Sequence, residues 1–144
     1  MNTNNSVSKK WFCKAYKGEL PEYFKDWSMT DDEGWTIAHV AAAIGCLPKD
    51  FKEWKLASPE GWTVAHETAY YGRLPTNFNQ WELTDSEGWT VAHAAAFTGH
   101  LPEGFKHPEW TNNNGDTVSG FSEIYKKRVL AKKLLEDHQL RVLP

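Results

Sequence analysis

The 144-residue sequence has two cysteines and no long apolar run, and both features limit what kind of protein it can be. Cys13 and Cys46 do not occupy matching positions in the internal repeat described below, so they offer no disulfide framework. The N-terminal MNTNNSVSKK lacks the apolar core of a signal peptide, and no stretch approaches the roughly 18 apolar residues of a membrane span. We therefore expect a cytoplasmic protein that does not enter a membrane.

The chain as a whole also lacks a strong excess of either charge. Its formal net charge of −3 and its pI of about 6.1 argue against a general affinity for nucleic acid or anionic membranes. The charges are nevertheless segregated. Residues 1–125 hold 10 Lys and Arg against 17 Asp and Glu, whereas residues 126–144 hold 6 against 2. We expect an acidic body with a basic C-terminal end.

Motifs for catalysis and cofactor binding are missing as well. The sequence contains no glycine-rich phosphate loop, no Cys/His metal spacing and no paired carboxylates in a pocket-like context. The segment HETAY at 66–70 lacks the second histidine of a zinc-protease motif. We expect no enzyme, and therefore no catalytic residue, metal or cofactor.

What the sequence does contain is a repeat of 27 residues. The hexapeptide GWTVAH occurs at 61–66 and 88–93, and GWTIAH occurs at 34–39. Three full units lie between a partial unit at 15–33 and a degenerate one at 115–130. A fixed period of this length is typical of a stacked array, whose end units differ from the inner ones. We expect a disordered segment over 1–10, an array over 11–117 and a C-terminal capping helix over 118–144, regular to about residue 139.

Each unit carries signals for two helices and little strand. Threonines suited to N-capping precede the first helix, and glycines end it: Thr36, Thr63 and Thr90, then Gly45, Gly72 and Gly99. Prolines predict the first residue of a second, shorter helix: Pro48, Pro75 and Pro102. Apolar residues then recur at helical spacing and predict core ladders between units: Leu47, Leu74, Leu101, Phe51, Phe78, Phe105, Trp54 and Trp81.

The pattern G-x-T-x-x-H-x-A-A-x-x-G-x-L resembles the ankyrin repeat over residues 13–125. The period is about six residues shorter than in that family, and Ile37, Val64 and Val91 replace its proline. The resemblance implies an all-α, ankyrin-like helical solenoid of about three full short repeats, with an atypical N-terminal half-repeat and a long C-terminal capping helix. It also implies that the repeated histidines tie adjacent turns by hydrogen bonds to the backbone. Stacked units about 8–10 Å apart would hold His39, His66 and His93 too far apart to share one zinc ion.

The repeated tryptophans Trp35, Trp62 and Trp89 admit two interpretations. They could stack along the array and cover its edge, or they could form an exposed aromatic strip for a peptide, a sugar or a nucleic-acid base. Identical residues in successive units favour the structural role, because recognition surfaces usually vary from unit to unit.

Positions that vary between units are the better candidates for recognition. In ankyrin-like stacks the end of the first helix lines the concave face that binds partners. The candidate residues at this end combine tyrosine, phenylalanine and arginine, as interface hot spots do. They are Ile44, Glu67, Tyr70, Tyr71, Arg73, Phe97 and His100.

The basic tail has two features beyond an ordinary cap. Lys126, Lys127, Arg128, Lys132 and Lys133 could contact phosphate, although a solvated helix face is the more common role. Leu130, Leu135, Leu140, Val142 and Leu143 exceed what one packed stripe needs, so the tail could contact a partner or a second copy. We expect a monomer, or a dimer formed through this helix.

These features together favour a binding protein. We expect an adaptor or inhibitor that masks a surface on another protein. The expectation that it is a bacterial or viral antagonist is an analogy with small stand-alone arrays of this size. The acidic body favours a basic partner surface, such as the nucleic-acid channel of an enzyme, while nucleic acid itself is disfavoured. The alternative is a ligand-binding module that uses Trp35, Trp62 and Trp89 for a sugar or single-stranded nucleic acid.

Overall fold

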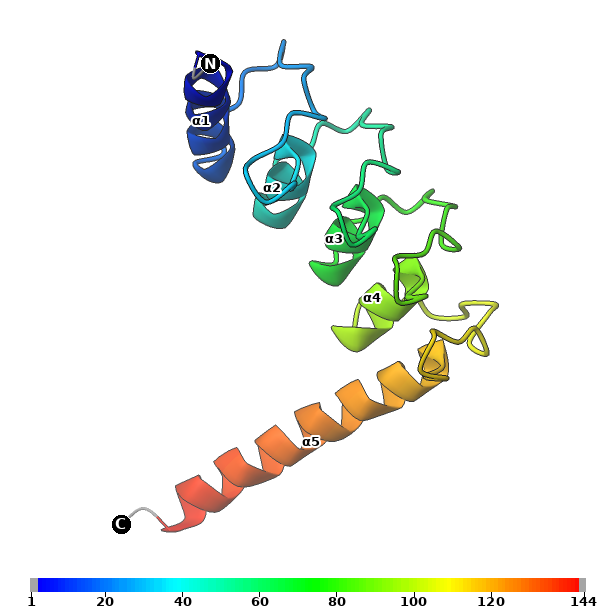
Figure 1. Ribbon diagram of the computed structural model, residues 1–144. Helices are drawn as coiled ribbons and strands as arrows, with labels where there is room; N and C mark the ends of the chain where they lie inside the picture. The colour runs from blue at the N-terminus through cyan, green and yellow to red at the C-terminus, as the bar shows by residue number, and fades with distance from the viewer. Residues whose placement is uncertain (1–2, 143–144) are drawn as a thin grey trace.

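The computed structural model describes residues 3–142, with the side chains of residues 6–139, and its regular elements are five helices. These are α1 (Thr3–Tyr16), α2 (Ile37–Ile44), α3 (Val64–Tyr70), α4 (Val91–Phe97) and α5 (Val118–Val142). The expected all-α class is confirmed. The helices lie side by side in chain order, and each one packs against its neighbours in the sequence (Figure 1). Among the described helices, none is long and apolar enough to cross a membrane.

The three short helices begin and end where the sequence predicts. The side chain of Thr36 accepts a hydrogen bond from the backbone N–H of His39, and Thr63 and Thr90 do the same for His66 and His93. These bonds satisfy amide groups that have no partner within the helix. At the other end of α2, Gly45 adopts φ 89°, a left-handed conformation that lacks a steric penalty only for glycine.

The second helix that was expected in each unit does not form. Pro48 and Pro75 instead begin tight turns, in which their carbonyls accept hydrogen bonds of 3.1 Å from the N–H groups of Phe51 and Phe78. A segment of so few residues gains too few helical hydrogen bonds to offset the cost of nucleation. The prediction of a second helix was therefore wrong, because a proline followed by an apolar residue three positions later fits a single turn equally well.

The expected aromatic ladder forms even without that helix. Rings of successive units meet edge to face, with centroids 5.6 Å apart for Trp27 and Phe51 and 5.4 Å apart for Trp54 and Phe78. The series continues through Trp81 to Phe105 at 5.5 Å. Such contacts add to the free energy gained from burying the rings. This ladder and the buried helix alanines form the core of the row.

Residues 3–10 form most of α1 in place of the expected disordered segment, while residues 1–2 lie outside the described part. Phe12 and Ala15 are buried, and the ring of Trp11 lies 4.9 Å from that of Phe24. α1 packs on α2 and covers the open end of the row. A segment of polar composition stays disordered when its few apolar residues cannot be buried, and here a neighbouring segment buries them.

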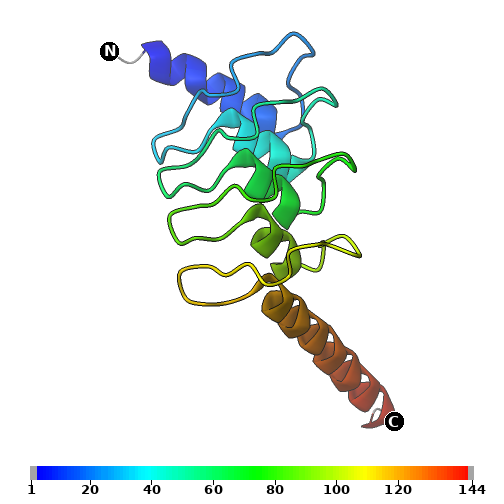
Figure 2. The ribbon, with the colours of Figure 1, turned by 90° about the vertical axis from the view of Figure 1, so that its right-hand side faces the viewer.

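A seven-residue loop precedes the helix in each unit, and an isolated β-bridge closes it. The bridges join Thr30 to Thr36, Ala57 to Thr63, Thr84 to Thr90 and Thr111 to Thr117. These loops stack along one side of the row (Figure 2). We refer to residues 30–36, 57–63, 84–90 and 111–117 as the capped loops.

The final helix, α5, begins at the predicted boundary and extends beyond the row (Figure 1). Val118 and Phe121 are buried against the last unit. Its later apolar residues are largely exposed: Ile124 49%, Val129 49%, Leu130 57%, Leu134 59% and Leu135 64%. The side chains of Leu140, Val142 and Leu143 lie outside the described residues. Only the first turns of α5 therefore cap the row.

Candidate functional site

The three histidines of the repeat link neighbouring units rather than forming a site. In each, Nδ1 faces the capping threonine, and Nε2 lies within hydrogen-bond distance of a backbone carbonyl in the next unit. The Nε2 to carbonyl distances are 2.8 Å from His39 to Trp62, 2.8 Å from His66 to Trp89 and 3.0 Å from His93 to Asp116. The neutral form with hydrogen on Nε2 satisfies both partners. The implied role, in which histidine ties adjacent turns to the backbone, is therefore observed.

Burial of the three imidazoles governs their protonation. Loss of solvation lowers the pKa of His39, His66 and His93 from the usual value, and the hydrogen bond to the next unit's carbonyl opposes this effect only in part. Within the described residues, no group of three or more metal-ligating side chains could hold an ion.

Two sets of candidate residues come together on one surface: the repeated tryptophans and the varying positions at the end of the first helix. The rings of Trp62, Tyr70, Trp89, Phe97 and Phe121 form a continuous cluster, which we call the aromatic face. Centroids lie 6.2 Å apart for Trp62 and Trp89, and 6.3 Å apart for the stacked rings of Tyr70 and Phe97. Phe121 closes the cluster at 4.8 Å from Trp89 and 5.7 Å from Phe97.

The aromatic face is only partly shielded from solvent. Trp62, Tyr70, Trp89 and Phe97 are half-buried, and Phe121 is buried beneath them. A partly exposed cluster of aromatic rings on a small protein is typical of an interaction site. The rings therefore serve both packing between units and a surface that a ligand could contact.

Cationic and polar groups border this face. Tyr71 is 43% exposed and lies edge-on to Tyr70, with 5.4 Å between ring centroids. The guanidinium of Arg73 lies 5.6 Å from the Tyr71 ring, and that of Arg128 lies 4.9 Å from the Phe97 ring. Exposed tyrosine next to arginine is the composition that dominates binding energy at protein interfaces.

Glu67 lies within the face and bonds to one of its tryptophans. Its Oε2 accepts a hydrogen bond of 2.6 Å from the indole N–H of Trp62. Burial raises the pKa of the Glu67 carboxyl, and the hydrogen bond from Trp62 counteracts part of that rise. This bond fixes the orientation of the Trp62 indole.

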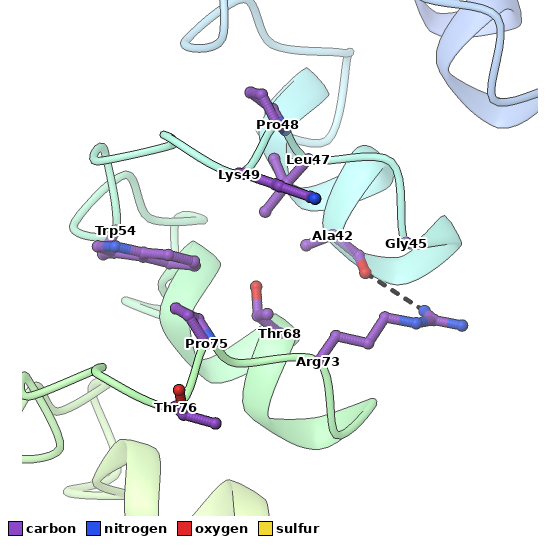
Figure 3. A pocket seen from close by; sticks show the side chains of 10 residues that line it. All are labelled: Ala42, Gly45, Leu47, Pro48, Lys49, Trp54, Thr68, Arg73, Pro75 and Thr76. Atoms are coloured by element: carbon purple, nitrogen blue, oxygen red, sulfur yellow. Dashed lines mark hydrogen bonds between the residues drawn. The ribbon is translucent and has the colours of Figure 1, made fainter.

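Arg73 and His100 have a structural role in addition to their exposure. The Arg73 guanidinium donates a hydrogen bond of 3.4 Å to the carbonyl oxygen of Ala42 (Figure 3). It donates another to the carbonyl oxygen of Ala43, which also lies at the C-terminal end of α2. A cation at this position is stabilised by the helix dipole. The Arg73 side chain also borders a cavity of about 420 Å³, which Trp54 lines as well. His100 packs over Gly72 in the same way that Arg73 packs over Gly45.

The remaining candidates lie at the N-terminal side of the face. Ile44 ends α2 at the position that Tyr71 occupies in the next unit, and its side chain is 43% exposed. Trp35 lies edge-on to His39, with 5.2 Å between centroids, and is half-buried. It shares a groove with Trp62 instead of joining the ring cluster.

Two contributors from α5 were not predicted from the sequence. Phe121 and Arg128 approach Phe97, and this approach depends on how that helix crosses the last unit. No signal within the sequence shows that crossing.

A glutamate precedes the glycine of each hexapeptide, and no binding role was predicted for these residues, Glu33, Glu60 and Glu87. The constant spacing of these glutamates before the tryptophans was a signal that could have indicated one.

Comparison with known proteins adds no assignment. No protein-family model matches the chain, and no curated protein sequence matches it significantly.

Proposed function

We propose that this protein is a non-enzymatic protein-interaction module, an adaptor or inhibitor that uses the aromatic face to bind and mask a surface on another protein. The observation that carries the proposal is the contact between Tyr70, Tyr71 and Phe97 on a partly exposed surface bordered by Arg73 and Arg128. Aromatic rings and arginines at the centre of a patch provide most of the binding energy in protein complexes.

We further propose that the chain is an ankyrin-like solenoid with shortened units. Supporting this are one helix per 27 residues, the threonine cap and the histidine bond to the next unit. In this scheme the proline turn replaces the family's second helix. Such arrays offer an extended surface rather than a deep cleft, which favours binding over catalysis.

The partner proposed here carries a basic surface, such as the nucleic-acid channel of an enzyme, and the protein would block it as a bacterial or viral antagonist. Support comes from the acidic balance of residues 1–125, with 10 Lys and Arg against 17 Asp and Glu. Charge complementarity speeds association and selects the partner. Direct binding to nucleic acid is disfavoured because the same charges repel phosphates.

Affinity capture from the native cell with matched variants tests the proposal. Tyr71→Ala removes an exposed ring of the site, and the control Asn77→Ala changes an exposed residue of a proline turn. We expect one protein to be retained by the wild type and by Asn77→Ala, and to be lost with Tyr71→Ala. Equal retention by all three proteins would contradict the assignment of the aromatic face.

A ligand-binding module is the second candidate. The half-buried indoles of Trp62 and Trp89, 6.2 Å apart, favour it because such rings can stack on a sugar or a base. Quenching of tryptophan fluorescence by an oligosaccharide or a single-stranded oligonucleotide would support this candidate. Absence of quenching, combined with capture of a protein partner, would support the adaptor.

A further inference from the structure

The capped loops form a second surface beside the aromatic face. Trp35 and Trp62 line an open groove of about 690 Å³ together with Glu33, Glu60, Asp85 and Glu87. The groove runs across three successive capped loops, the first, second and third along the chain. It therefore presents the same pair of residue types, a carboxylate and an indole, more than once along its length.

Backbone hydrogen bonds hold the loops in a fixed relation. The N–H of Ser86 donates to the carbonyl of Glu60 at 2.9 Å, and that of Asn113 donates to the carbonyl of Glu87 at 2.9 Å. The bond from His39 to the Trp62 carbonyl joins the first unit to the second, and the bond from His66 to the Trp89 carbonyl joins the second to the third. The groove is thus preorganised, so that a ligand does not have to order its walls.

The charge of the loops is entirely of one sign. The four capped loops contain seven carboxylates and no Lys or Arg; these are Asp31, Asp32, Glu33, Glu60, Asp85, Glu87 and Asp116. Glu33, Glu60 and Glu87 are exposed. Neither of the two ion pairs found among the described residues, His107 with Glu109 and Lys126 with Glu123, involves a loop carboxylate.

We propose that this groove binds an extended, cationic segment of a partner protein, with arginine or lysine side chains lying on the indoles and against Glu33, Glu60 and Glu87. Indole faces attract cations, and adjacent carboxylates add an attraction that neither a sugar nor a nucleic acid would gain. The proposal rests on the proposed protein-binding function and names the chemistry of the partner segment.

The geometry also gives the spacing of the bound side chains. Neighbouring units contact one another through their helices, and packed helices usually lie about 8–10 Å apart. A segment in the polyproline II conformation rises about 3.1 Å per residue with three residues per turn, so every third side chain returns to the same side after about 9 Å. The segment that fits best therefore has a basic residue at every third position.

The test uses the full chain and a short synthetic peptide with arginine at every third position in a glycine and serine background. Binding is measured by calorimetry and by tryptophan fluorescence. The groove variant is Glu33→Gln, Glu60→Gln, Glu87→Gln. The control variant is Glu22→Gln, Glu53→Gln, Glu103→Gln, which changes three exposed glutamates outside the capped loops and alters the net charge equally. Circular dichroism verifies that both variants keep the helical signal.

We expect the peptide to bind the wild type and the control variant, and to bind the groove variant at least about tenfold more weakly. A twin peptide with glutamate in place of arginine should not bind. Absence of binding to the wild type, or equal binding to both variants, would overturn the proposal. Tyr71 lies outside the groove, so Tyr71→Ala should leave peptide binding unchanged. Peptide binding by the groove variant and partner capture by Tyr71→Ala therefore test the two surfaces separately.

Discussion

Acidification should destabilise the fold through the three bridging histidines. Each imidazole is buried, with an exposed fraction of 2% for His39 and 0% for His66 and His93. Burial lowers the pKa of all three, and protonation of Nδ1 would place a second donor against the backbone N–H of the capping threonine. The unfolded chain therefore takes up protons at a higher pH than the folded chain.

The sign and size of the effect follow from this difference in bound protons. A group whose folded pKa is lowered contributes full stability above its unfolded pKa, and that stability is lost as the pH falls from the unfolded to the folded pKa. A histidine with an unfolded pKa of about 6.5 that stays neutral in the fold loses at most about 1.4 kcal/mol at pH 5.5. Three such histidines lose up to about 4 kcal/mol, a large part of a small domain's stability.

Urea unfolding at about pH 7.5 and about pH 5.5 measures this loss. The variant His66→Gln retains a donor and an acceptor but does not titrate, so the pH dependence should fall by about one third. The matched control His107→Gln removes an exposed histidine and no bridge between units. Equal stability of the wild type at the two pH values, or the same pH dependence for both variants, would refute the reasoning.

Three further outcomes follow from the packing. Phe78→Ala, at the centre of the aromatic ladder, should lower the free energy of unfolding by about 3–5 kcal/mol in urea titrations, and a loss below about 1 kcal/mol would contradict the ladder's role. Glu67→Gln should stabilise the fold at neutral pH, because the raised pKa of Glu67 means that its ionised form is disfavoured in the folded state. The gain should vanish as the pH falls below the unfolded pKa of the glutamate, and thermal unfolding at neutral pH and at that lower pH measures it. If α5 mediates a dimer, Leu130→Lys with Leu134→Lys should shift the mass measured by light scattering from dimer to monomer, whereas a wild type that is monomeric at high concentration would exclude this role.

Much of the local structure could be predicted because its causes lie within a few residues. Thr36 and His39 are three positions apart, so the hexapeptide alone specifies the cap, and Gly45 specifies the helix end. The proline turn could not be separated from a short helix, because Pro48 and Phe51 have the same spacing in both. α1 was missed because its burial depends on Phe24, a residue of another segment.

The sequence by itself determined the period, the three short helices, their caps and the aromatic ladder. These depend on local hydrogen bonding and on apolar residues that recur in every unit. The tertiary structure alone decided that Trp62, Tyr70 and Phe97 share one face with Phe121, and that Trp35 faces a groove of carboxylates. The physical reason is that such contacts depend on the offset and angle between stacked units, which packing across the whole row sets and no single unit encodes.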